Sequence, residues 1–150
     1  SIHIDFMFIG TFYYNIDDKG RIAVPPKYRE ALSGELVLAR TFDKSVAIYT
    51  IDEWNRFVEK LSSSLGSSNR ESRLTKRFFL SGAHSLELDK QGRLLLPAHL
   101  REEASLDREA VIVGIDNHLE IWDANKFEEA EEDIDIEEIE AFLDQKGISF

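Results

Sequence analysis

One ten-residue stretch of this chain occurs twice, and this repeat constrains the fold more than any local propensity does. Residues 16–25 read IDDKGRIAVP, and residues 88–97 read LDKQGRLLLP, 72 positions later. Each copy is followed by a short segment typical of a helix, at Lys27–Leu32 and His99–Ala104. Self-similarity of this kind indicates tandem copies of one supersecondary unit. The sequence therefore predicts two copies of a small module, each displaying a cationic turn.

The composition indicates a globular chain whose two halves share a core. The chain has 150 residues, 43% of them hydrophobic. Each copy has only about 70 residues, which is marginal for a domain that folds alone. Cysteine is absent, which excludes disulfides and thiolate chemistry and fits a cytosolic protein. We therefore expect the halves to pack against each other.

The negative charge is concentrated near the C-terminus. The formal net charge is −11, and residues 120–144 alone hold 12 acidic residues and 1 basic residue. The rest of the chain is electrically balanced, with 17 residues of each sign. An acidic tail on a balanced body leaves room for local positive patches. The overall charge therefore does not exclude a nucleic-acid partner.

The sequence offers no membrane segment, metal site or catalytic constellation. The longest apolar runs, such as Ala110–Ile115, are far shorter than the ~20 residues of a spanning helix, and residues 1–6 do not read as a signal peptide. The four histidines lack metal-ligand spacing; they are His3, His84, His99 and His118. No serine nucleophile motif or Gly-rich phosphate loop is present. We expect a cytoplasmic protein that is not an enzyme and has no metal, cofactor, small-molecule substrate or membrane partner.

Both copies predict the element order ββαββα, and hence an α+β fold. Strands are expected at residues 8–16, 21–24, 36–39 and 46–49, and again at 83–88, 93–96, 110–115 and 118–122. Residues 17–20 should close a hairpin between the first two strands. Helices are expected at about 27–32, after Asp52 as N-cap, after Asn69 to about Leu80, from Pro97, and from about Asn125. Serines at 62–68 predict a hinge, and Ile134–Leu143 predicts an amphipathic acidic helix that needs a partner.

An aspartate precedes an arginine by four residues across each turn, as Asp17 and Arg21 and as Asp89 and Arg93. This spacing brings the two side chains together across a hairpin. On the simplest interpretation they form an exposed ion pair that contributes at most ~1 kcal/mol. However, the pair occurs at matching places in both copies, with Lys19 and Lys90 on the turns. Repeated cations on protruding turns suit the recognition of phosphates and base edges.

The motifs resemble those of the MraZ family of bacterial transcription regulators, in order and spacing, from about Met7 to Phe127. The matching segments are FIGT at 8–11, DDKGR at 17–21 with Pro25, RFFLSGA at 77–83, and DKQGR at 89–93 with LPA at 96–98. The resemblance implies two tandem AbrB-like, swapped-hairpin modules forming a double-split β-barrel. The implied modules are 7–66 and 81–128, with a connecting helix at 67–80 and an acidic tail at 129–150. That tail, beyond about Glu128, is expected to lie outside the match.

The resemblance also implies a function. The expected protein regulates the division and cell-wall gene cluster, binds direct repeats in a promoter as a ring-shaped homo-oligomer, and is associated with the nucleoid. The implied DNA-binding residues are Lys19, Gly20, Arg21, Lys90, Gly92 and Arg93, with Asp17 and Asp89 orienting the arginines. The alternative is a structural or adaptor ring that does not bind DNA. Salt-dependent retention on double-stranded DNA would separate the two classes.

Two charged features of the sequence each allow two interpretations of their role. Arg70, Arg73 and Arg77 share one helix face, which predicts either a second DNA-binding surface or, as this pattern more often indicates, an interface with an acidic neighbour. The acidic tail is either an internal DNA mimic that competes for the basic turns or a packing helix that caps a neighbouring subunit.

Overall fold

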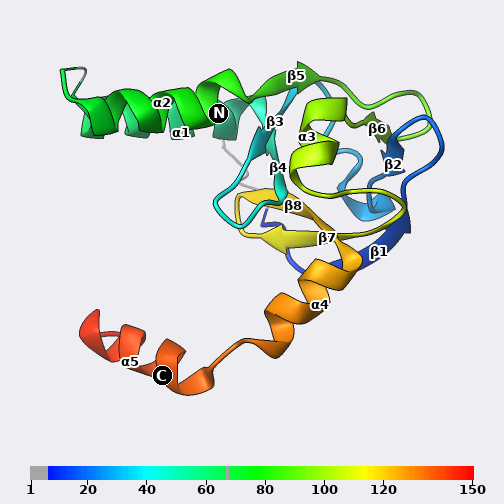
Figure 1. Ribbon diagram of the computed structural model, residues 1–150. Coiled ribbons are helices and arrows are strands. Elements are labelled where there is room, and N and C mark those ends of the chain that lie inside the picture. The colour runs from blue at the N-terminus through cyan, green and yellow to red at the C-terminus, as the bar shows by residue number, and fades with distance from the viewer. Residues whose placement is uncertain (1–6, 67) are drawn as a thin grey trace.

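The two predicted copies of ββαββα are present in the computed structural model, which describes residues 7–66 and 68–150. The strands are β1 Thr11–Asn15, β2 Arg21–Ala23, β3 Leu36–Arg40, β4 Val46–Thr50, β5 His84–Leu86, β6 Arg93–Leu95, β7 Glu109–Ile115 and β8 His118–Asp123. The helices are η1 Pro26–Tyr28, α1 Ile51–Ser64, α2 Arg70–Ser81, α3 Ala98–Glu103, α4 Ala124–Glu132 and α5 Ile136–Gln145. Figure 1 shows their arrangement. His3 and Ser67, named in the sequence predictions, lie outside the described residues.

The first copy departs from the predicted helix at 27–32. Only one turn of 3-10 helix forms, at η1, and the chain then continues as turns up to Gly34. Pro25 and Pro26 at its start carry no N–H groups, and Gly34 follows closely, so few residues are left for a longer helix. The second copy forms the expected α-helix, α3.

The hairpin predicted across residues 17–20 and its counterpart in the second copy are wrong, because the two copies exchange these strands; β3 still pairs with β4, and β7 with β8. β1 pairs with β7, β5 pairs with β3, and β2 pairs with β6, all antiparallel. Two backbone hydrogen bonds close the first turn: Asp17 N donates to Arg21 O at 2.9 Å, and Gly20 N donates to Asp17 O at 3.0 Å. Outside the turn, β1 pairs with β7 over five residues, whereas β2 has only three residues with which it could pair. Each copy is thus completed by strands of the other.

The sheet is open, so the predicted barrel does not close. Six strands form one antiparallel sheet in the order β1-β7-β8-β4-β3-β5, and β2 and β6 form a separate two-stranded ribbon. β1 and β5 are the two edges and do not pair with each other. Because β1 to β4 correspond to β5 to β8, this order is symmetric about the β8–β4 pair. The fold is therefore a mixed α+β fold with pseudo-twofold symmetry.

The prediction that the halves share one core is confirmed. A single apolar cluster joins both copies; its fully buried members include Ile22, Leu36, Leu38, Ile48, Leu94, Ile112 and Leu119. β2 and β6 close this cluster through Ile22 and Leu94, which are opposite each other in the ribbon and both 0% exposed. The ribbon is therefore held on the body by its inner face.

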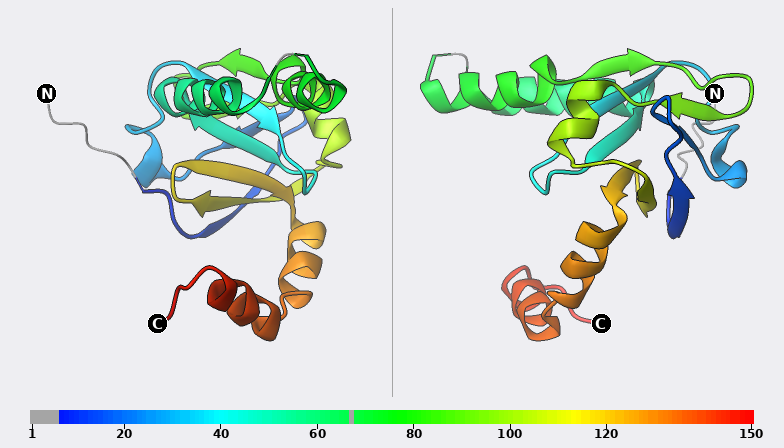
Figure 2. Two further views of the ribbon diagram at one scale, coloured as in Figure 1. Left: turned by 90° about the vertical axis from the view of Figure 1, so that its left-hand side faces the viewer. Right: turned by 45° about the vertical axis from the view of Figure 1, so that its right-hand side comes forward.

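Helices α1 and α4 cover the other face of the sheet, whereas η1 and α3 pack on the shared core through Tyr28 and Leu100. Trp54 of α1 packs on Val37 and Ala39 of β3, and Phe127 of α4 packs on β7. Thr50, not the predicted Asp52, caps α1, because its side chain accepts a hydrogen bond from Glu53 N. Asn69 caps α2 as predicted. Figure 2 shows α1 and α2 side by side at one side of the molecule.

The C-terminal segment ends in the predicted amphipathic helix. Residues 133–135 connect α4 to α5, which stands away from the rest of the chain (Figure 1). Ile136, Ile139 and Phe142 of α5 are exposed. Among the described residues, no helix is long and apolar enough to cross a membrane.

Candidate nucleic-acid interface

The first turn is organised by the carboxylate of Asp17. One oxygen, Oδ1, accepts hydrogen bonds from the backbone N–H groups of Lys19 and Arg21, at 3.0 and 2.9 Å. The other, Oδ2, accepts a hydrogen bond from Arg21 Nε at 2.8 Å. Gly20 has a φ of 83°, a left-handed conformation that glycine adopts at little cost. The sequence DDKGR therefore specifies a closed turn with the arginine fixed at its exit.

The second turn has the same geometry, as the repeat predicted. Asp89 Oδ1 accepts hydrogen bonds from the N–H groups of Gln91 and Arg93, both at 2.9 Å. Asp89 Oδ2 accepts one from Arg93 Nε at 2.8 Å. Gly92 has a φ of 74°. Identical geometry in two separate parts of the sequence follows from the shared motif.

Both ion pairs leave part of the guanidinium available. Each pair engages only Nε, and within residues 7–66 and 68–150 no other acceptor bonds to the guanidinium of Arg21 or Arg93. Both arginine side chains are 29% exposed. The two terminal nitrogens of each therefore remain for an external acceptor, while the bond at Nε fixes the plane of the group.

The aspartates stay ionised well into the acid range. The Arg21 N–H holds the pKa of Asp17 below its usual range; partial desolvation opposes this shift, and the Arg21 guanidinium and the Lys19 N–H reinforce it. The Arg93 N–H lowers the pKa of Asp89 in the same way, with the corresponding contributions from Arg93 and Gln91. At neutral pH both carboxylates are therefore charged acceptors that hold their arginines.

The β2–β6 ribbon brings the two arginines to one surface. Arg21 lies opposite Leu95, and Ala23 lies opposite Arg93, in an antiparallel register. Directly opposed residues point to the same face, and faces alternate along a strand. Since Ile22 and Leu94 face the core, Arg21 and Arg93 must share the outward face. As diagonal neighbours their Cβ atoms are roughly 7 Å apart.

The ribbon and both turns are tied together by hydrogen bonds between the copies. Leu96 N donates to Gly20 O at 2.9 Å, and Val24 N donates to Gly92 O at 3.1 Å. The carbonyl of each turn glycine thus accepts a bond from the other copy. The separation of the two arginines is therefore fixed by the ribbon.

Two further arginines at the turns were missed by the sequence predictions. Arg29 lies against Gly92, where a Cβ would collide with its side chain, and Arg101 lies against Gly20, where a Cβ would be 3.0 Å from Arg101 Nε. Each arginine thus covers the turn of the other copy. Arg29 and Arg101 are 72 residues apart, so the repeat itself contained the signal.

These two arginines are not neutralised by carboxylates. Within residues 7–66 and 68–150, neither Arg29 nor Arg101 forms an ion pair, although Arg101 Nε donates to Leu96 O at 3.2 Å. Beside the second turn, a hollow of about 340 Å³ is lined by Arg29, Ser33, Gly34, Glu87, Leu88, Asp89, Lys90 and Gly92. Each turn therefore carries cations from both copies.

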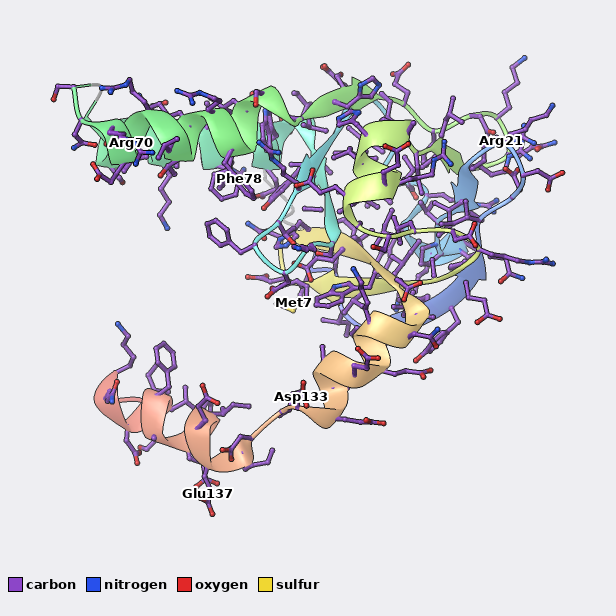
Figure 3. The ribbon with its side chains drawn as sticks, in the orientation of Figure 1. Met7, Arg21, Arg70, Phe78, Asp133 and Glu137 are labelled. Carbon is purple, nitrogen blue, oxygen red and sulfur yellow. The ribbon has the colours of Figure 1, made fainter. Side chains whose placement is uncertain are left out.

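The structure does not bring all predicted basic residues together. Lys19 and Lys90 are exposed on the turns, beside Arg21 and Arg93. In contrast, Figure 3 shows Arg70 at the opposite end of the molecule from Arg21. Arg73 and Arg77 lie on the same helix, α2, so the α2 face is a separate surface. Helix α5 also lies away from the turns in Figure 1, so the acidic tail does not cover them.

Comparison with known proteins gives a family match to both halves. A family described as "MraZ protein, putative antitoxin-like" matches residues 7–78 and again residues 79–146. The second match extends past Phe127 and includes α5, so the expectation that the acidic tail lies outside the match was wrong.

Relatives with assigned names are similar over most of the chain. A protein of Caldanaerobacter subterraneus subsp. tengcongensis named transcriptional regulator MraZ is 39% identical over 144 residues, 95% of this chain and 100% of the relative. One of Desulfitobacterium hafniense with the same name is 47% identical over 116 residues, 77% of this chain and 80% of the relative. A third, from Moorella thermoacetica, is 42% identical and covers 82% of this chain and 85% of the relative.

Proposed function

The chain belongs to the MraZ family, and from this premise we propose that it is a transcription regulator that binds double-stranded DNA through the outward face of the β2–β6 ribbon. Its relatives are named transcriptional regulators and not enzymes. The observation that carries the proposal is the presence of two oriented arginines, Arg21 and Arg93, on one face of a two-stranded ribbon. A ribbon of this kind fits into the major groove.

The arginines suit guanine recognition. An arginine that contacts guanine O6 and N7 uses two nitrogens, and two remain on each guanidinium after Nε has bonded to its aspartate. The roughly 7 Å between the two Cβ atoms matches about two base-pair steps of about 3.4 Å each. Arg21 and Arg93 are therefore assigned to base edges, and Asp17 and Asp89 to orienting them. Gly20 and Gly92 allow the turns to close and leave room for Arg101 and Arg29, which lie against them.

Other side chains complete the surface. Leu95 lies opposite Arg21 and is 58% exposed, which places an apolar group on the outward face where it can contact a thymine methyl. Lys19, Lys90, Arg29 and Arg101 are assigned to phosphates, because they flank the ribbon and have no carboxylate partner among the described residues.

The finer features of the family resemblance belong to the same proposal. The strand exchange between the copies supports an AbrB-like, swapped-hairpin assignment, with modules at 7–66 and 81–128, a connecting helix at 67–80 and a tail at 129–150. We infer a ring-shaped homo-oligomer at the nucleoid, on direct repeats in the promoter of the division and cell-wall cluster. One ribbon contacts few base pairs, so repeated ribbons on repeated sites would supply the affinity.

The test is a gel-shift titration with duplex DNA containing the direct repeats upstream of the chain's own gene. The double variant Arg21→Ala/Arg93→Ala should lose about 1–3 kcal/mol for each base contact and discriminate less against a scrambled duplex. The double variant Lys60→Ala/Lys126→Ala is the matched control, because it removes equal charge from α1 and α4, away from both the ribbon and the α2 face. Equal binding by both variants would overturn the proposed interface.

The alternative is a structural or adaptor oligomer without DNA binding. In that case the Asp–Arg pairs would only stiffen the turns. Retention of the wild-type protein on double-stranded DNA would then show no dependence on salt, whereas phosphate contacts produce a steep one.

A further inference from the structure

The DNA interface leaves two features of the chain without a role: the basic face of α2 and the apolar face of α5. Ile136, Ile139 and Phe142 of α5 are 63%, 47% and 57% exposed. They lie at helical spacing on one side, with carboxylates on the other. A helix with such a stripe is stable when the stripe is covered by another apolar surface. Helix α5 therefore requires a receptor surface.

A matching surface exists on α2. A groove of about 400 Å³ is lined by Arg40, Phe42, Leu74, Thr75, Arg77, Phe78 and Phe79. Phe42 is 79% exposed although its ring stacks on Phe78 at 5.4 Å and meets the edge of Phe79 at 5.3 Å. A cluster of aromatic rings exposed to this degree marks an interaction site in soluble proteins. We call it the α2 groove.

Charge makes the two surfaces complementary. Helix α2 carries Arg70, Arg73, Lys76 and Arg77 against a single acid, Glu71, whereas Arg40, over the Phe78 ring at 4.5 Å, is already paired with Glu103 at 3.6 Å. Helix α5 carries Glu137, Glu138, Glu140 and Asp144 and no cation. With 10 and 12 residues, α5 and α2 are about 15 and 18 Å long, so one can lie along the other.

We propose that α5 of one copy packs its apolar face into the α2 groove of a second copy. Helix α4 is anchored on the sheet through Phe127, and only residues 133–135 separate it from α5. Figures 1 and 2 show α5 apart from α2 in every view. A link of three residues spans at most about 11 Å, which limits how far α5 can swing within its own chain.

The contact is heterologous, because two different surfaces meet. Contacts of this type build closed rings when the rotation between neighbours closes. The inference rests on the proposed assembly and names its contact; it does not depend on DNA binding. It also assigns the α2 arginines to an acidic neighbour and the acidic tail to a partner subunit.

Disulfide trapping tests the contact, because the full chain has no cysteine. One preparation carries Thr75→Cys in the α2 groove, and a second carries Leu143→Cys on the apolar face of α5. Mixed under mild oxidation, they should form a disulfide-linked dimer of the two preparations. Ala141→Cys, on the opposite face of α5, is the matched control and should form at least about tenfold less. Adding Ile139→Ser to the Leu143→Cys chain should lower the yield about tenfold, since it removes part of the apolar stripe without adding a charge that Arg77 could pair with.

Three outcomes would overturn the inference. These are equal yields from Leu143→Cys and Ala141→Cys, no effect of Ile139→Ser, and an internal disulfide in a chain that carries both cysteines. Light scattering distinguishes a failure of the proposed α5 contact from a failure of the proposed assembly. If multi-copy particles persist while trapping fails, the α5 contact is wrong and the assembly stands; a single-copy mass at all concentrations overturns both. Circular dichroism checks that each variant is folded.

Discussion

Replacing Arg29 tests whether each turn really recruits a cation from the other copy. Arg29 is exposed, lies against Gly92, and has no ion-pair partner among the described residues. We therefore expect Arg29→Ala to change the free energy of unfolding by no more than about 0.5 kcal/mol, as for ordinary surface substitutions. If Arg29 binds a phosphate, its loss should instead appear in the salt dependence of DNA binding.

The expected change in the salt slope follows from one phosphate contact by Arg29 for each ribbon. Each phosphate contact contributes about 0.9 to the slope of log K against log salt, so on a duplex with a single repeat, contacted by one ribbon, Arg29→Ala should make the slope shallower by about 0.9. Between about 50 and 200 mM salt, that corresponds to about a 3.5-fold smaller loss of affinity. Adding Arg101→Ala should double the change in slope. Arg101→Ala should also cost about 0.5–1.5 kcal/mol of stability, because Arg101 Nε donates to Leu96 O.

Fluorescence anisotropy of a labelled duplex, titrated at four salt concentrations, measures the slope directly. Arg29→Lys should keep the wild-type slope, because a lysine retains the charge. Lys60→Ala, on the exposed side of α1, is the matched control and should also leave the slope unchanged. The reasoning is refuted if Arg29→Ala and Lys60→Ala give the same slope as the wild type while Arg21→Ala alters binding.

Two further predictions concern the turns and the strand exchange. The folded pKa values of Asp17 and Asp89 are depressed, so their contribution to stability is complete above the unfolded value near 4 and is lost as pH falls through the folded value. The protonation of Asp17 and Asp89 should therefore not change DNA binding between neutral pH and about pH 4. NMR of the Arg21 and Arg93 backbone amides should show the turns opening only in stronger acid. Opening of the turns above about pH 5 would contradict this assignment. Gly114→Ala should lower the free energy of unfolding in urea by about 1–3 kcal/mol, because the new Cβ would lie 2.5 Å from the Cα of Ile9. Gly66→Ala, where a Cβ meets nothing within 4 Å, is the control, and equal stability of both variants would show that the N-terminal segment does not pack on β7.

The sequence predicted the local structure better than the pairing of strands. Asn69 as a cap, the shared core and the Asp–Arg turns all follow from interactions within a few residues or from the chain length. The choice of strand partners does not follow from either. Alternating apolar residues define which face of β1 is buried but not which strand it joins, and β3 and β7 are equivalent elements of the two copies. Pairing within a copy and pairing between copies therefore satisfy the same pattern.

The sequence prediction missed Arg29 and Arg101 for the same reason. Arg29 and Arg101 lie eight residues after Arg21 and Arg93 in the chain, and each lies against the turn of the other copy only because the copies exchange strands. Their matching positions in the repeat were visible in the sequence. What the sequence did not contain was the exchange of strands that carries each arginine to the opposite turn.

The strand exchange changes what two cationic turns can do. Had each copy kept a local hairpin, Arg21 and Arg93 would lie on two separate fingers, whose spacing would depend on how the copies packed. In the exchanged fold both arginines sit on one ribbon, and the register of three residue pairs fixes their distance. Each turn is also tied to the other copy, since Gly20 O accepts a hydrogen bond from Leu96 N and Gly92 O accepts one from Val24 N. Two copies are therefore the smallest unit that can present the pair, because a single copy would lack half of the ribbon and its covering arginine.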